Sequence, residues 1–145
     1  MIRAHQGQDD KQYQDALAIR RKVFIEEQGV PLHLEIDEFE QEAVHFVVYD
    51  EEQPIGAGRF RRFDETTAKV ERICILPEYR GKHIGNTLMD EIEKIADTMG
   101  FNKLKLNSQS TAIPFYEKRG YEINSPEFMD AGIPHRAMVK HQATS

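Results

Sequence analysis

The sequence has little of what cross-links or anchors a protein: one cysteine, Cys74, and no tryptophan among 145 residues. A single cysteine excludes an internal disulfide and a zinc site built from several thiolates. No apolar stretch approaches the roughly 20 residues that span a bilayer. The N-terminal segment MIRAHQGQDD also lacks the apolar core of a signal peptide. We therefore expect a cytoplasmic protein without a membrane partner.

Positive charge is also in the minority, with 19 Lys and Arg against 25 Asp and Glu and a net charge of −6. A general nucleic-acid binder normally has a basic face and a high isoelectric point, so we expect no nucleic-acid partner. A hydrophobic content of 39% is typical of a soluble globular protein. The length predicts one domain, residues 1–145, with a substantial core.

Apolar periodicity and turn residues divide the chain into strands and helices. Strands are expected at 2–5, 43–49, 54–63, 69–76, 103–107, 121–124 and 136–140. A first helix is expected to start at Asp9 or Asp10 and to end at Gly29, a second to follow the 80–85 loop and end at Gly100, and a third at 112–119. Residues 31–42 fit a short helix or an ordered loop. The helix before Gly100 has one apolar stripe, formed by Leu88, Ile92, Ile95, Ala96 and Met99. This order predicts a mixed α/β fold around one sheet.

The stretch ERICILPEYRGKHIGNTLM, residues 71–89, passes from a strand into a helix through a loop rich in cations and glycine. The free N–H groups and the positive dipole end of a helix N-terminus suit a phosphate group. Gly81 and Gly85 would let the backbone approach the phosphate, while Arg80 and Lys82 add full charges. A surface turn with solvated cations explains the loop alone equally well. The loop is neither a dinucleotide-binding fingerprint nor a P-loop.

Several motifs, in the right order, resemble the GNAT superfamily of N-acetyltransferases. Residues 80–85, RGKHIG, are similar to its acyl-CoA loop, Gln/Arg-x-x-Gly-x-Gly/Ala, except that His83 stands where glycine is preferred. Residues 114–121, PFYEKRGY, are similar to its second signature. The stretches VFIEEQGVP, EIDEFE with His45, and GIPHRAM resemble the small bacterial ElaA/YjcF-like branch.

This resemblance implies a fold, a donor and a reaction. The fold would be a GNAT-like, mixed and mostly antiparallel sheet of six to seven strands flanked by helices. The donor would be acetyl-CoA, from which the acetyl group passes directly to an amine in a ternary complex. The strand at 73–75 would bind the pantetheine arm and the loop would bind the pyrophosphate. The expected donor-binding residues are Ile73, Cys74, Ile75, Arg80, Gly81, Lys82, His83, Ile84, Gly85, Asn86, Asn107 and Gln109; for the last two, loop capping is an equal alternative.

Two side chains are candidates for catalysis. The resemblance places Tyr116 beside the donor, where its phenol would protonate the departing thiolate; the alternative is a core aromatic. Glu71 shares a face with Ile73 and Ile75 if the strand alternates regularly, which would let it accept a proton from the amine. Its alternative is an ion pair with an arginine of the neighbouring strand. Cys74 is expected to be a small buried residue and not a nucleophile.

The acceptor is expected to be a small-molecule or peptide amine. Arg59 and Arg61 share a strand face that would bind an anionic group on it, although a solvated face explains them equally well. Glu27, in an acidic region, and His135 are further candidates, each with a structural alternative. The histidine spacing predicts no metal, and a homodimer is compatible with the sequence. A non-catalytic acyl-CoA-binding or sensing module, or transfer to an acceptor other than an amine, remains the competing function.

Overall fold

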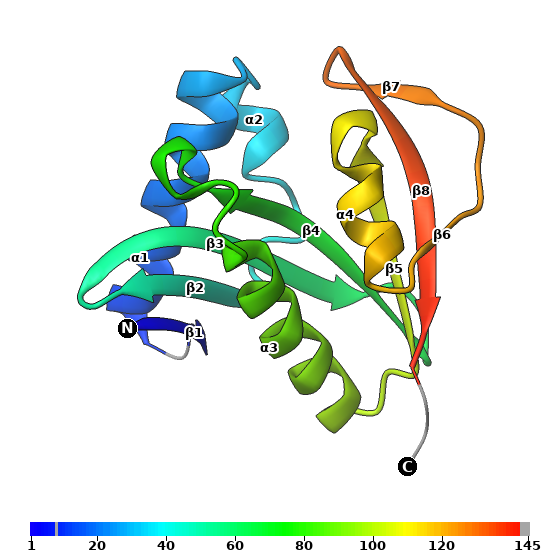
Figure 1. The fold of residues 1–145 in the computed structure, drawn as a ribbon, viewed down its shortest axis with the longest axis horizontal. Helices are drawn as coiled ribbons and strands as arrows, with labels where there is room; N and C mark the ends of the chain where they lie inside the picture. The colour runs from blue at the N-terminus through cyan, green and yellow to red at the C-terminus, as the bar shows by residue number, and fades with distance from the viewer. Residues whose placement is uncertain (8, 143–145) are drawn as a thin grey trace.

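A twisted sheet with helices on both faces forms the body of the protein (Figure 1). The computed structural model describes residues 1–7 and 9–142. Within this part of the chain the strand order is β1-β2-β3-β4-β5-β8-β6, with β7 paired to β8. The strands are β1 (Ile2–Gln6), β2 (Val44–Asp50), β3 (Gln53–Arg62), β4 (Thr67–Ile75), β5 (Lys103–Gln109), β6 (Glu122–Ile123), β7 (Phe128–Asp130) and β8 (Ile133–His141).

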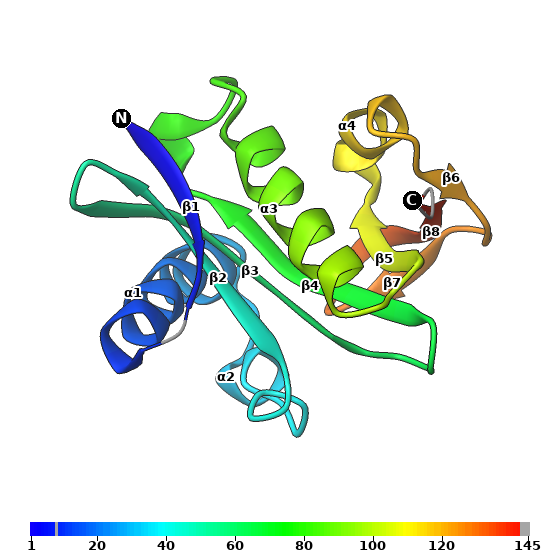
Figure 2. The same cartoon turned by 90° about the horizontal axis from the view of Figure 1, so that it is seen from below.

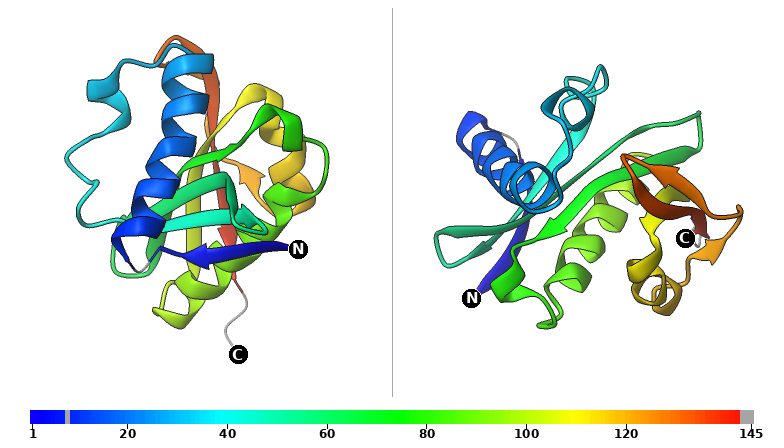
Figure 3. Two further views of the ribbon diagram at one scale, coloured as in Figure 1. Left: turned by 90° about the vertical axis from the view of Figure 1, so that its left-hand side faces the viewer. Right: turned by 90° about the horizontal axis from the view of Figure 1, so that it is seen from above.

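Two helices cover each face of this sheet (Figures 2 and 3). On one side lie α1 (Asp10–Arg20), its π-helical continuation η1 (Arg21–Glu27), and the single turn α2 (Leu32–Glu35). On the other side lie α3 (Ile84–Thr98) and α4 (Ile113–Lys118); short 3₁₀ turns occur at η2 (Pro77–Tyr79) and η3 (Ser110–Ala112). Asp9 starts α1 as an N-cap, because its carboxylate accepts a hydrogen bond from the backbone N–H of Gln12 at 2.8 Å. Among the described residues, no helix has the length and apolar character needed to cross a membrane.

The predicted mixed α/β fold with a mostly antiparallel sheet is confirmed, since β4 and β5 form the one parallel pair in the described part of the chain. Among the described residues the sheet has eight strands, against about six to seven expected, because the short β7 carries too few residues to leave a periodic signal. The strands predicted at 43–49 and 54–63 leave residues 50–53 as a four-residue hairpin loop, and this loop length was wrong. The turn between β2 and β3 has two residues, and Glu51 adopts a positive φ of 55° there.

The core forms separately on the two faces of the sheet. Leu88, Ile92 and Ala96 of α3 are fully buried in the larger cluster, as the apolar stripe predicted. Met99 is 48% exposed, because α3 ends at Thr98 and the chain then turns away. The smaller cluster packs α1 against the opposite face of β2, β3 and β4, and includes Ile19 and Cys74.

The parallel pair β4–β5 is incomplete, and this defect positions the functional site. Pairing extends from Thr67 and Lys103 to Val70 and Leu106, and β4 then runs on to Ile75 without β5 beside it. The two strands meet at one end and separate toward the other (Figure 1). A β-bulge at Arg72 accompanies the separation, because Arg72 and Ile73 of β4 lie opposite the single residue Gly58 of β3, and Arg72 has a φ of 61°.

Candidate active site

A cavity of about 750 Å³ occupies the space where β4 and β5 separate. This volume lies within the range of small-molecule binding sites, roughly 300–1,000 Å³. Its walls come from β4, the end of β5, η1, the loop after η2, and α4. The predicted site residues that line it are Glu71, Ile73, Cys74, Ile75, Arg80, Gly81, His83, Ile84, Gly85, Asn86, Asn107, Gln109, Tyr116 and His135.

The glycine loop places the N-terminus of α3 at this cavity. His83 is the N-cap residue of α3 and makes no side-chain capping hydrogen bond, so the first N–H groups of the helix lack a side-chain acceptor there. His83 has a φ of 65°, a left-handed conformation that costs little only for glycine. This explains physically why glycine is preferred at its position. Gly81 has a φ of 78° and open space around it.

The cations of the loop take different positions. Arg80 lines the cavity and is held by a bidentate ion pair with Glu27, with both N–O distances at 2.7 Å. Glu27 therefore lies at the loop end of the cavity. Lys82 is exposed, with its Nζ 5.5 Å from the ring centroid of Tyr79, and does not line the cavity.

Gly85 has a packing role that the sequence did not indicate. A Cβ at this position would lie 3.0 Å from the ring of Phe115, which is closer than a relaxed contact. Gly85 thus lets α3 and α4 approach each other. A larger side chain at Gly85 would displace Phe115 as well as narrow the loop.

Tyr116 is both a packed core aromatic and a residue of the cavity wall, the two positions that the sequence left as alternatives. Its ring packs edge-on against Phe115 at 5.0 Å and Tyr121 at 5.6 Å, and only 7% of the residue is exposed. It also lines the cavity, and its hydroxyl has no hydrogen-bond partner among the described residues. Burial raises the pKa of Tyr116 above its ordinary value, so the phenol holds its proton at neutral pH.

The expectation that Glu71 shares a face with Ile73 and Ile75 was wrong. Ile73 and Ile75 pack on the α3 side of the sheet. The bulge at Arg72 interrupts the alternation, so that Glu71 lies on the α1 side with Arg59. Cys74 lies on that side too, and burial raises its pKa to about 12, in agreement with an unreactive thiol.

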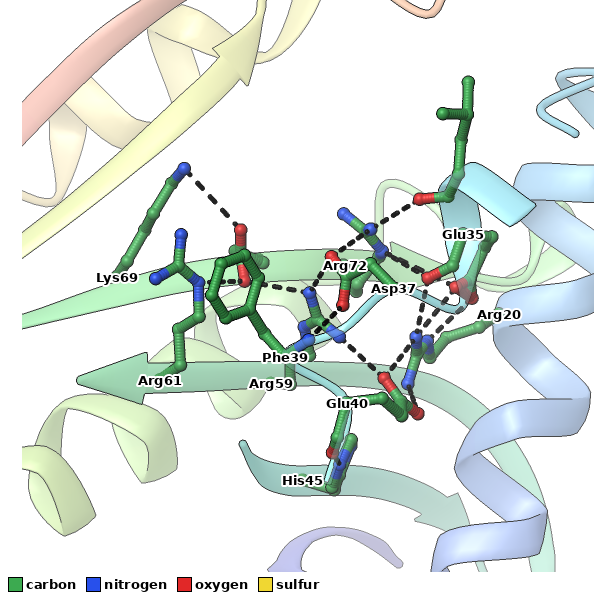
Figure 4. Close-up of polar contacts among 12 residues, drawn as sticks. Arg20, Glu35, Asp37, Phe39, Glu40, His45, Arg59, Arg61, Lys69 and Arg72 are labelled. Carbon is green, nitrogen blue, oxygen red and sulfur yellow. Dashed lines mark hydrogen bonds and ion pairs between the residues drawn. The ribbon is translucent and has the colours of Figure 1, made fainter. Parts of the chain in front are cut away.

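Glu71 belongs to a network of ion pairs between the sheet and the segment that follows α2 (Figure 4). It accepts hydrogen bonds from Arg59 Nη2 at 3.0 Å and Arg61 Nε at 3.2 Å, and Lys69 Nζ lies 3.6 Å away. The ion pair that the sequence left as an alternative is therefore present.

Two fully buried arginines form the centre of this network. Arg20 makes two hydrogen bonds to each of Glu35 and Glu40, at 2.7–2.9 Å. Arg59 donates to Glu40 at 2.6 Å and to Asp37 at 2.7 Å. All of Arg59's charged contacts are with these protein carboxylates, so the structure gives no support to Arg59 as a site for an acceptor anion.

The remaining predicted residues lie at the cavity wall. Asn107 and Gln109 line it from β5, and the Gln109 amide donates to the Gln28 side chain at 3.1 Å. His135 stacks on Phe128, and its Nδ1 lies 2.7 Å from the carbonyl oxygen of Ile133. These contacts are those of a structural histidine, although one edge of His135 reaches the cavity.

Sequence reasoning missed the bulge, the buried arginine network and the η1 wall of the cavity. Arg72 carried no signal, and Glu35 and Glu40 entered only as part of the acidic stretch EIDEFE, because a charged residue looks the same in the sequence whether it is buried or solvated. Phe24 of η1 and its C-cap residue Gln28 line the cavity, and helical periodicity gave no indication of a π-helical turn there.

The cavity between parted parallel strands, with a helix N-terminus at its edge, is of the kind that binds an elongated phosphate-bearing ligand. The sequence model for the acetyltransferase (GNAT) domain matches residues 8–142. The chain therefore belongs to the GNAT family of acetyltransferases.

Individual relatives agree with this family. The chain is 47% identical to the uncharacterized N-acetyltransferase YjcF of Bacillus subtilis over 135 residues, which cover 92% of this chain and 96% of the relative. Escherichia coli ElaA has the same fold, with a TM-score of 0.83 at 18% identity over 97% of this chain and 99% of that one. A Thermoplasma acidophilum PaiA N-acetyltransferase, solved with coenzyme A, gives a TM-score of 0.73 at 18% identity over 97% and 99% of the two chains. The chain thus falls with the small bacterial ElaA/YjcF-like proteins.

The buried network predicts a specific loss of stability in acid. Burial alone would raise the pKa of Glu40, but hydrogen bonds from Arg20 and Tyr13 outweigh it and lower the pKa to about 2. A depressed carboxyl pKa adds stability that is complete above the unfolded value of 4.5 and disappears as the pH falls towards 2. We expect a loss of about 3 kcal/mol across this window, measured as the urea-unfolding free energy at constant ionic strength.

A Glu40→Gln protein should lose this pH dependence. It should also be about 3–5 kcal/mol less stable at neutral pH, because two buried arginines lose a partner. Glu52→Gln, which changes an exposed carboxyl in the β2–β3 turn, should alter neither quantity. Burial alone would raise the pKa of Asp37, but the hydrogen bond from Arg59 outweighs it and lowers this pKa, so Asp37 should leave only a smaller acid slope. A slope in the Glu40→Gln protein as steep as in the unaltered protein would show that the stabilising contact lies elsewhere.

Proposed function

We propose that this protein is an acetyl-CoA-dependent N-acetyltransferase that passes the acetyl group directly from the thioester to an amine. The observation that carries this proposal is the separation of β4 and β5 beside the N-terminus of α3. One cavity thereby offers unpaired strand backbone for an amide-rich arm and helix N–H groups for phosphate. The coenzyme A in the PaiA structure agrees with this use of the fold.

The chain's own groups would act at three points. Peptide N–H groups near the Arg72 bulge would stabilise the negative charge that develops on the carbonyl oxygen. The neutral phenol of Tyr116 would donate its proton to the departing sulfur, which agrees with its place at the cavity and its raised pKa. Glu71 would accept a proton from the amine on the α1 side of the sheet, through water where the distance requires it.

Release of free thiol from acetyl-CoA in the presence of an amine panel tests the proposal, with mass spectrometry of the products. We expect thiol release that depends on the amine. The product should be heavier than the amine by one acetyl group, about 42 Da. A sensing module would bind coenzyme A and show a raised melting temperature, about 2.7 kcal/mol of added stability at 100 times the dissociation constant. Binding without turnover across the panel would therefore favour the non-catalytic alternative.

Tyr116→Phe separates the catalytic from the structural role of this residue. The substitution removes the hydroxyl and keeps the packing against Phe115. If the phenol protonates the leaving thiolate, kcat should fall by ~10²–10⁴ while coenzyme A affinity stays the same. Steady-state kinetics and a coenzyme A titration measure the two quantities.

Tyr121→Phe is the matched control for this experiment. Tyr121 packs edge-on against Tyr116 but donates its hydroxyl to Glu93 at 3.0 Å, away from the cavity lining. Its loss should cost about 1 kcal/mol of stability and leave kcat unchanged. Equal turnover by Tyr116→Phe and Tyr121→Phe would remove Tyr116 from the mechanism.

The role of Glu71 is tested through the pH dependence of turnover. A Glu71→Gln protein that has lost a general base should lose most activity at low pH and recover partly as free amine becomes abundant. The rate–pH profile should be measured with urea-unfolding curves, because Glu71 also neutralises Arg59 and Arg61. A uniform loss with an unchanged profile would assign Glu71 to the ion network alone.

A further inference from the structure

A row of cations crosses three neighbouring strands at the start of β4, far along that strand from the glycine loop. Arg61 of β3 is in register with Lys69 of β4, and Lys69 is in register with Lys105 of β5. Residues in register on neighbouring strands lie about 4.8 Å apart and point to the same face. Lys69 lines the cavity, so the row begins at the wall of the proposed active site.

This row has less negative charge than positive. Glu71 contacts Arg61 and Lys69, but it also neutralises the buried Arg59. Lys105 has no acidic partner among the described residues, and its Nζ lies 5.6 Å from the ring centroid of Phe63. The side chains of Arg61 and Lys69 are only 13% and 18% exposed, so solvent screens their charges poorly.

The row and the adjoining ion network together carry more positive than negative charge. Six cations face four carboxylates, which leaves two positive charges in a protein whose net charge is −6. The cations are Arg20, Arg59, Arg61, Lys69, Arg72 and Lys105, and the carboxylates are Glu35, Asp37, Glu40 and Glu71. Burial, followed by the neighbouring charges of Lys69 and Lys103, lowers the pKa of Lys105. An anion placed here would relieve this repulsion.

The guanidinium of Arg61 is also fixed in a position from which it can bind such an anion. Its guanidinium lies 3.8 Å from the ring centroid of Phe39, and only its Nε is engaged, with Glu71. The two terminal nitrogens have no partner among the described residues. The planar group is therefore fixed in place with donors to spare, which is the arrangement that binds carboxylate and phosphate groups well.

We propose that Lys69, together with Arg61 and Lys105, binds a carboxylate or phosphate group on the acceptor, so that the substrate is an amine carrying an anionic group. This inference rests on the proposed acetyl transfer to an amine. Lys69 precedes the Arg72 bulge by three residues, about 10 Å along a strand. The anion and the amine of the acceptor should therefore be separated by several bonds, as in an ω-amino acid or an ω-aminoalkyl phosphate.

Calorimetric titration of the coenzyme A-loaded protein at fixed ionic strength tests the site without turnover. The probes are 5-aminopentanoate, 4-aminobutyl phosphate and the uncharged 5-aminopentanamide. We expect at least one anionic amine to bind about tenfold or more tightly than the amide, as a charge-assisted hydrogen bond would produce. The comparison of the carboxylate with the phosphate identifies which anion the row prefers.

Substitutions then assign the preference to the row. Lys69→Met and Lys105→Met should each reduce the preference severalfold, while Lys69→Arg should keep most of it. Lys94→Met is the matched control, because it removes the same charge from an exposed position on α3, across the sheet. The proposal is overturned if neither anionic amine binds, or if the unaltered protein binds the amide and the anionic amines with equal affinity. It is also overturned if both methionine variants keep the affinity ratio of the unaltered protein.

The outcome is distinguishable from failure of the proposed function. If the anionic amines bind with the expected preference but no acetylated product forms from any amine, the anion site stands and the acetyltransferase proposal fails. If uncharged and anionic amines are acetylated with equal kcat/KM, the transferase stands and the anion site is rejected.

Discussion

Beyond Val70 and Leu106, β4 and β5 no longer pair, and the peptide groups on their facing edges lose the partners that a continuous sheet would supply. Backbone N–H and C=O groups buried without partners are costly, so such a gap must be filled by water or by a ligand with its own amides. The bulge at Arg72 bends β4 at this point, and the same strand then leads into the loop that sets the N-terminus of α3. The cavity, the unpaired backbone and the helix end thus follow from one incomplete strand pair.

The face of the sheet opposite α3 is held together in a different way. In the segment after η1, Leu34 and Ile36 are 46% and 39% exposed, whereas Glu35 and Glu40 are buried. This reverses the usual placement of apolar and charged side chains. Ion pairs to Arg20 and Arg59, and not apolar packing, therefore fix the segment on the sheet. Compared with apolar packing of the same volume, such pairs add little net stability because desolvation offsets their attraction, whereas loss of one partner is costly. They therefore tolerate only one arrangement of donors and acceptors. That geometry positions the α1 side of the cavity, where the proposed acceptor would bind.

The sequence predicted what depends on local periodicity and on motifs. Periodicity correctly predicted the strands at 54–63 and 103–107 and the helix before Gly100. The motifs correctly predicted that residues 73–75 and 80–86 line the cavity, with the exception of Lys82. The side assigned to Glu71 was wrong, because a single positive φ at Arg72 inverts a period-two pattern without changing any residue type. The buried network was also invisible to the sequence, since its central pairs, Arg20–Glu35, Arg20–Glu40 and Arg59–Glu40, lie 15–20 residues apart in the chain and each member also fits a solvated position. Long-range pairing of charges is decided by the tertiary fold, which composition does not encode.

The distribution of charge along β4 connects these features. The sequence as a whole is acidic, yet positive groups gather at both ends of this one strand, at Lys69 before the bulge and at Arg80 after Ile75. A cavity with low-dielectric walls focuses such fields, whereas the acidic surface elsewhere repels anions. In the proposed complex, the phosphates of the donor would lie at the second end and the anion of the acceptor at the first. The reacting atoms would meet near the bulge between them, at the residues of β4 that line the cavity. One strand would then set the order of donor, reaction centre and acceptor, because its ends attract anions and its middle cannot complete a sheet.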